Sequence, residues 1–146
     1  MATIGKMIQT VQSNDGLAGD GLRCCFLLPF EVASTYTVDG TAQPMTTIGV
    51  EPVATYVLGK PGAVIGAFVM VATAPGSAKT ATFKARKNGT ADTAVIATVT
   101  GASATAGSIY DVEMPFDGDD TIGAEVALTS SGTASDSKMF LLVHLR

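Results

Sequence analysis

Apolar and polar residues alternate with a period of two over much of the C-terminal half of the chain. This spacing is typical of a β-strand that buries one face and exposes the other. In residues 78–87 and 120–129 the outward positions are mostly Thr, Lys, Arg and Glu. The predicted inward sets are Ala81, Phe83 and Ala85; Tyr110, Val112 and Met114; and Ile122, Ala124, Val126 and Leu128. The pattern therefore predicts successive amphipathic strands.

Clusters of turn-forming residues separate these segments at short, regular intervals. Gly supplies positive φ, Pro presets φ, and Asn or Asp tolerates the left-handed region, so each cluster can reverse the chain. We expect Lys87 to Asp92 to form a hairpin loop between strands 78–87 and 94–100. Short strands at this spacing predict an all-β protein, an antiparallel β-sandwich.

Three segments are apolar on both faces: Arg23 to Phe30, Ala63 to Thr73 and Lys138 to Arg146. In the middle segment we place Ile65, Ala67, Val69 and Val71 on one face, and Val64, Phe68, Met70 and Ala72 on the other. A two-layer sandwich buries only one face of each strand. The second face needs cover from the N-terminal segment, a long loop or another subunit. We predict subunit contacts at Phe68, Met70, Phe140 and Leu142.

Residues 1–21 differ from the rest of the chain. Ile4, Met7, Ile8 and Val11 fall at roughly helical spacing, and Gln12 to Gly21 has a linker composition. We predict an extended N-terminal arm (1–21) followed by one sandwich domain (22–146). The apolar stripe of the arm is expected to dock on a neighbouring subunit; the alternative is a frayed terminus without a role.

Composition and net charge limit the classes of partner that the protein is expected to bind. The 146 residues carry a net charge of −4, and the nine Lys and Arg are scattered, which argues against a nucleic-acid partner. No stretch reaches the roughly 18 apolar residues of a membrane span, and no signal peptide begins the chain, so we expect a soluble protein made in the cytoplasm. The mean hydropathy of +0.36 favours a homo-oligomer.

Few residues are candidates for catalysis or metal binding. His144 is the only histidine, and no motif links it to Cys24, Cys25 or a serine. We expect both cysteines to be reduced and buried. The acidic cluster Asp117 to Asp120 could offer oxygen ligands to an ion, but an ordinary turn is the favoured interpretation. We predict no catalytic residues, no cofactor and no metal, and therefore no enzyme.

From Lys60 onward the succession of elements resembles the jelly-roll decoration and head-fibre proteins of tailed bacteriophages. The resemblance is carried by an apolar strand, a Lys-Asn-Gly hairpin, a Thr/Ala-rich strand, a small-residue loop, a Gly-Asp-x-x-Ile strand entry and a final apolar strand. In this chain these elements are Ala63 to Thr73, Lys87 to Gly89, Ala94 to Thr100, Gly101 to Gly107, Gly118 to Ile122 and Met139 to Leu145.

The resemblance implies a jelly roll and a cement role. It implies a homotrimer on the capsid surface of the virion that clamps adjacent major capsid subunits. The alternative is a virion-attached receptor- or carbohydrate-binding module of the same fold. Such modules favour exposed aromatic residues, whereas this chain has no Trp and only Tyr36, Tyr56 and Tyr110.

Overall fold

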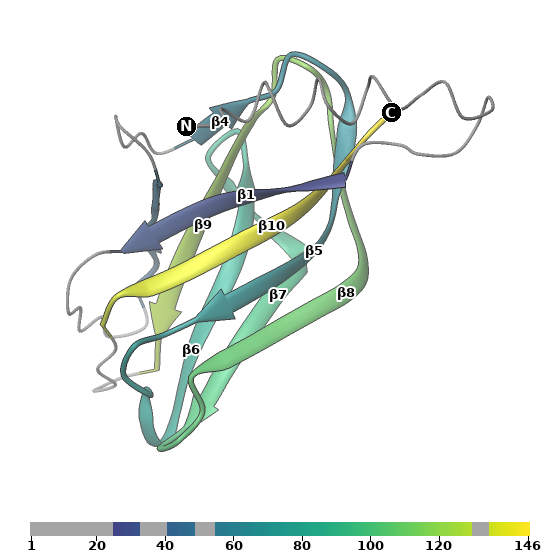
Figure 1. Ribbon diagram of the computed structural model, residues 1–146. Coiled ribbons are helices and arrows are strands. Elements are labelled where there is room, and N and C mark those ends of the chain that lie inside the picture. Colours follow the sequence, from purple (N-terminus) through teal and green to yellow (C-terminus); the bar gives the residue numbers. More distant parts are fainter. Residues whose placement is uncertain (1–24, 33–40, 49–54, 130–134) are drawn as a thin grey trace.

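The computed structural model describes residues 25–32, 41–48, 55–129 and 135–146 and forms an antiparallel β-sandwich of two five-stranded sheets (Figure 1). The prediction of an all-β sandwich is confirmed. The strands are β1 (Cys25–Val32), β2 (Gln43–Pro44), β3 (Thr46–Thr47), β4 (Thr55–Val57), β5 (Gly62–Met70), β6 (Gly76–Lys87), β7 (Thr90–Gly101), β8 (Ala106–Phe116), β9 (Thr121–Leu128) and β10 (Ser137–Leu145).

The first sheet has the order β3-β1-β10-β5-β8, and the second has the order β2-β9-β6-β7, with β4 also pairing with β9. In Figure 1 the long strands β1, β10, β5 and β8 cross in front of β9, β6 and β7. Most neighbouring strands are therefore distant in sequence, and β1 pairs with the last strand along its full length.

The core lies between the sheets and is made by the alternating inward residues. The predicted inward sets of β6 and β9 are all buried. So are Met139, Leu141, Val143 and Leu145 of β10. Tyr56 of β4 links the layers, because its ring packs edge-on against Phe30, with centroids 5.3 Å apart, and its hydroxyl donates to the Pro29 carbonyl oxygen.

The β6–β7 hairpin turns more tightly than predicted. Only Asn88 and Gly89 form the turn, with φ of 51° and 79°, as in a two-residue turn of the primed type. The residues predicted as loop after it belong to β7, which bulges: the Asp92 carboxylate accepts from the amides of Ala94 and Val95 at 2.7 and 2.9 Å. The bulge explains why the alternation becomes readable only from Ala94.

Face assignments in two strands are wrong because bulges reverse the alternation. In β8, Asp111 has φ of 57°, so Ile109 packs against the core and Tyr110 points outward. In β5, the pairing with β10 shifts between Val64 and Gly66. Val64, predicted to share the face of Phe68, is consequently buried, whereas Ile65, predicted to share the face of Ala67, is half-buried.

The expectation of a buried cysteine is wrong for Cys25. The alternation of β1 puts Phe26, Leu28, Phe30 and Val32 in the core, so Cys25 is exposed on the outer side of the first sheet. Cys24 lies outside the described residues. So does the whole predicted arm, 1–21, with Ile4, Met7, Ile8 and Val11.

Candidate interaction surface

The outer side of the first sheet carries an apolar surface. Large hydrophobic side chains are exposed here on three strands: Leu27 (43%), Phe68 (39%), Met70 (53%) and Tyr110 (49%). Pro29, Phe140 and Leu142 are half-buried beside them. We call these seven residues the apolar face. In an ordinary two-layer sandwich this side would carry polar residues that contact water.

The strand register makes the apolar face continuous. One row across the sheet runs from Leu27 to Leu142, Gly66 and Tyr110, and the next runs from Pro29 to Phe140 and Phe68. Directly opposed side chains in such rows have Cβ atoms about 4.5–5.5 Å apart. The residues therefore form a single patch rather than isolated exposed positions.

Tyr110 and Phe68 form the aromatic part of the face. Their rings meet edge to face, with centroids 5.3 Å apart and planes at 80°. Gly66, which pairs with Tyr110, leaves room beneath the ring, since a Cβ there would lie 3.4 Å from the Tyr110 ring and 2.8 Å from the Ile109 carbonyl oxygen. The bulge at Asp111 is what turns Tyr110 onto this face.

The structure brings together all four of the sandwich residues that the sequence nominated. Phe68 and Met70 were expected on one face and Phe140 and Leu142 on another, yet β5 and β10 are neighbours and present all four on the same side. Leu27 and Tyr110 were not nominated individually. Leu27 lies in a segment whose two-faced apolar pattern did mark it, whereas no pattern in the sequence locates the bulge that exposes Tyr110.

The outer side of the second sheet has the opposite character. It carries threonines that pair across strands, such as Thr80 and Thr100, whose hydroxyls lie 2.9 Å apart. Arg86 and Glu125 form an ion pair at 3.4 Å on the same side. Val57 of β4 is exposed (60%) at the edge of this sheet, but among the described residues it is the one large hydrophobic side chain exposed there, so the continuous apolar surface belongs to the first sheet.

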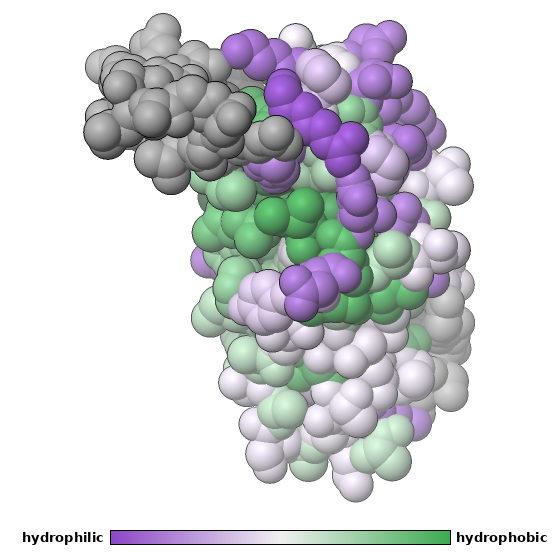
Figure 2. All heavy atoms as spheres, turned by 90° about the vertical axis from the view of Figure 1, so that its right-hand side faces the viewer, coloured by the Kyte–Doolittle hydropathy of each residue, from purple (hydrophilic) through white to green (hydrophobic). Residues whose placement is uncertain are grey.

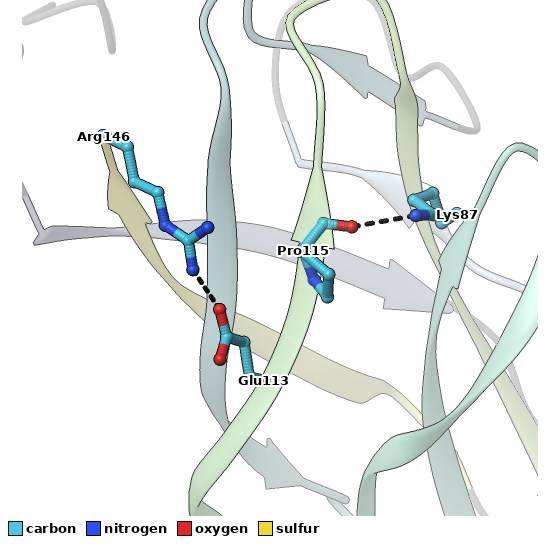
Figure 3. Close-up of polar contacts among 4 residues, drawn as sticks. All are labelled: Lys87, Glu113, Pro115 and Arg146. Atoms are coloured by element: carbon cyan, nitrogen blue, oxygen red, sulfur yellow. Dashed lines mark hydrogen bonds and ion pairs between the residues drawn. The ribbon is translucent and has the colours of Figure 1, made fainter.

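Charged groups border the apolar face at both ends. At one end, Glu31 and Lys138 are cross-strand neighbours in the same row as Met70. Near the other end, Arg146 forms an ion pair with Glu113 of β8, as Figure 3 shows. Figure 2 shows hydrophobic surface in the middle of the side that carries β8, with hydrophilic residues above it. An apolar centre with a polar rim is the usual anatomy of a protein–protein interface.

One small cleft opens at this end of the sandwich. Its volume is about 230 Å³, and it is lined by Pro61, Gly62, Lys87, Pro115, Phe116, Asp117 and Arg146. Its two cationic groups are already engaged: the Lys87 ammonium donates to the Pro115 carbonyl oxygen at 2.9 Å, and Arg146 pairs with Glu113 (Figure 3). The cleft is smaller than typical small-molecule sites, roughly 300–1,000 Å³.

The acidic cluster folds as a hydrogen-bonded turn. The Asp120 carboxylate accepts from the Asp117 amide at 2.8 Å and from the Asn88 side-chain amide. The Asn88 side-chain oxygen Oδ1 in turn accepts from the Thr121 backbone amide at 2.9 Å. These bonds connect the acidic turn to the β6–β7 turn. The hydrogen bonds from Asp117 and then Asn88 lower the pKa of Asp120. The Asp120 carboxylate oxygens thus accept hydrogen bonds that stabilise the turn.

His144 lies half-buried opposite Cys25 in the β1–β10 pair. Within the ranges that the structure describes, no three His, Cys, Asp or Glu side chains gather closely enough to hold a metal ion. The described strands and loops include no helix of the length and apolarity needed to cross a membrane. Comparison with known protein families and with curated proteins finds no match for this chain.

Proposed function

We propose that this protein is a structural virion protein that decorates the assembled head of a tailed bacteriophage and cements it by bridging major capsid subunits. The apolar face is the observation that carries the proposal. An exposed apolar patch with a polar rim is a site for contact with other protein subunits. The predicted assembly is a homotrimer on the capsid surface.

The strand order supports assigning the sandwich to the jelly rolls. With the two-residue edge strand β3 set aside and β2 and β4 counted together as the second of eight strands, the sheets have the orders 1-8-3-6 and 2-7-4-5. This arrangement corresponds to two Greek keys wound together, a fold found in viral capsid proteins and also in lectins. The fold is therefore compatible with both the virion role and the binding role, and the choice of function rests on the apolar face.

The contrast between the outer sides of the two sheets supports attachment of the subunit to the shell in one defined orientation. The threonine-rich side of the second sheet is suited to contact water, and the apolar face is suited to contact protein. A subunit with these two sides can cover a shell while remaining hydrated outside. The net charge of −4 fits a hydrated outer surface.

A binding experiment tests the cement role. The labelled protein is mixed with capsids stripped of decoration and, separately, with dissociated capsid subunits, and co-sedimentation is measured. We expect saturable binding to the assembled shell alone, because a bridging site exists only where subunits adjoin. Equal binding to dissociated subunits, or no binding to shells, would contradict the proposal.

One observation favours the alternative, a carbohydrate-binding module. Tyr110 and Phe68 expose an aromatic pair of the kind on which sugar rings stack. A glycan array separates the two functions. A Tyr110-dependent glycan signal, together with no attachment to shells, would support the binding module instead.

A further inference from the structure

The apolar face has no cover in the described part of the chain, while residues 1–24 precede β1 and contain a matching apolar stripe. We infer that residues 4–11 of one copy pack, as an amphipathic helix, on the apolar face of a second copy. This inference rests on the proposed homo-oligomer and names the contact that would hold it together.

The apolar stripe of residues 4–11 matches the apolar face in hydrophobic character and in size. Ile4, Met7, Ile8 and Val11 occupy i, i+3, i+4 and i+7 positions, which form one side of a helix. Lys6 falls on the opposite side, so the helix would present its charge to water. A helix is about 10 Å wide, and the four strands β1, β10, β5 and β8 span about 15 Å. One helix would therefore cover about two-thirds of the width of the patch and leave the remainder for contact with a capsid subunit.

The place where the arm joins the sandwich favours a neighbour over the same chain. β1 runs from Cys25 toward Glu31, and the apolar face lies along it beyond Cys25. Continued backward from Cys25, the strand direction leads away from that face. An arm that covered its own sheet would have to reverse direction first.

The linker is long enough to reach a second copy. The thirteen residues 12–24 span up to roughly 45 Å when extended, about three times the width of the face. Gly16, Gly19 and Gly21 lie within this segment and add conformational freedom where the path must bend. Exchange of arms around a closed ring would give every copy one docked arm.

A disulfide trap in the full-length chain tests the contact. Cys24→Ser and Cys25→Ser remove the native thiols, and Met7→Cys with Met70→Cys places one thiol on the stripe and one on the apolar face. After mild oxidation we expect covalent oligomers on a non-reducing gel. The matched control replaces Met70→Cys by Thr82→Cys, on the outer side of the second sheet, and should give at least about tenfold less cross-linked product, a factor that corresponds to about 1.4 kcal/mol.

Each other outcome overturns the inference. A monomer bridged within its own chain would show that the arm covers its own sheet. Equal cross-linking in the control pair, or none in either pair, would show that the stripe does not dock on the apolar face.

A second pair of variants leaves the sandwich untouched. Ile8→Asp should dissociate the oligomer at micromolar concentration, whereas Lys6→Asp, on the other side of the arm, should not; sedimentation velocity measures both. If both remain oligomeric, arm exchange is wrong. Because shell binding is measured separately, a protein that cements shells without exchanging arms would retain the proposed function and lose only this inference.

Discussion

At the scale of single residues, hydrogen bonds to one carboxylate hold the acidic turn together. Asp120 accepts from Asp117 and Asn88, which lowers the pKa of Asp120 in the folded protein. Its contribution to stability is therefore present above the usual Asp pKa, about 3.9, and is lost as the pH falls through the lower folded value.

This linkage predicts a pH-dependent effect of Asp120→Asn. At pH 7 the variant should melt at a lower temperature than the native chain. The difference should shrink as the pH falls below about 4, because the carboxyl group is protonated first in the unfolded chain and then, at lower pH, in the folded protein. Thermal melts across this range measure the effect, with Asp119→Asn in the same turn as the control. A difference that stayed constant down to pH 2 would show that the charge of Asp120 contributes nothing.

Gly107 marks a close approach between the two sheets. A Cβ at this position would lie 2.2 Å from the carbonyl oxygen of Thr98 on β7, a contact that backbone atoms cannot relieve. Gly107→Ala should therefore destabilise the fold by about 1–3 kcal/mol or more, the usual cost of overpacking. Urea denaturation measures it, and Ser108→Ala, at the exposed neighbouring position, should change the midpoint little. Equal midpoints for the two variants would show that β7 and β8 separate easily.

At the scale of whole strands, the alternation of apolar residues predicted the architecture well and failed at the bulges. The inward sets of β6 and β9 were readable because regular strands alternate strictly. Tyr110 and Ile65 were placed on the wrong faces, since one residue at positive φ or one extra residue reverses everything beyond it. No local pattern marks Asp111 as such a residue.

The pairing of strands that are distant along the chain likewise could not be predicted from the sequence. Phe68 and Phe140 are cross-strand partners although β5 and β10 are widely separated along the chain. The apolar surplus of each strand was visible, but its concentration in one face follows only from the topology. Most residues of the candidate surface could thus be predicted from the sequence, whereas their proximity could be seen only in the fold.

The apolar face predicts an interface rather than a core. Leu142 is half-buried on the outer side of β10, while its neighbours Leu141 and Val143 fill the core. Leu142→Asp should dissociate the oligomer and leave the circular dichroism spectrum of the β-structure largely intact. Ala127→Asp, on the outer side of the second sheet, is the matched control and should remain oligomeric. Unfolding of the Leu142→Asp monomer would assign that face to the core.

Removal of the arm separates folding from association. The described strands already enclose a continuous hydrophobic core, and we place residues 1–21 outside it. Their deletion should therefore change the thermal stability of the isolated domain little while weakening its attachment to partner subunits. Differential scanning calorimetry and sedimentation give the two readings. Loss of folding on deletion would show that the arm covers the sandwich of its own chain.

At the scale of the whole molecule, the proposed role is a linkage effect on the shell. A subunit that binds the assembled shell and not its dissociated parts stabilises the shell by an amount that grows with its free concentration. The gain is about 2.7 kcal/mol per site at a hundredfold excess over the dissociation constant. Shells that lack the protein should therefore still assemble but rupture at a lower temperature.

The chemistry of the apolar face adds a dependence on salt that tests the mode of attachment. The proposed contacts are mainly hydrophobic, and raised ionic strength screens exposed charges without weakening apolar burial. Adding the protein back to stripped shells should raise the temperature of genome release, and the rise should persist at high salt. The Leu142→Asp variant is the control and should give a smaller rise at equal concentration. An unchanged release temperature at saturating occupancy would refute cementing, and a rise that vanished in high salt would show that charges, rather than the apolar face, hold the subunit to the shell.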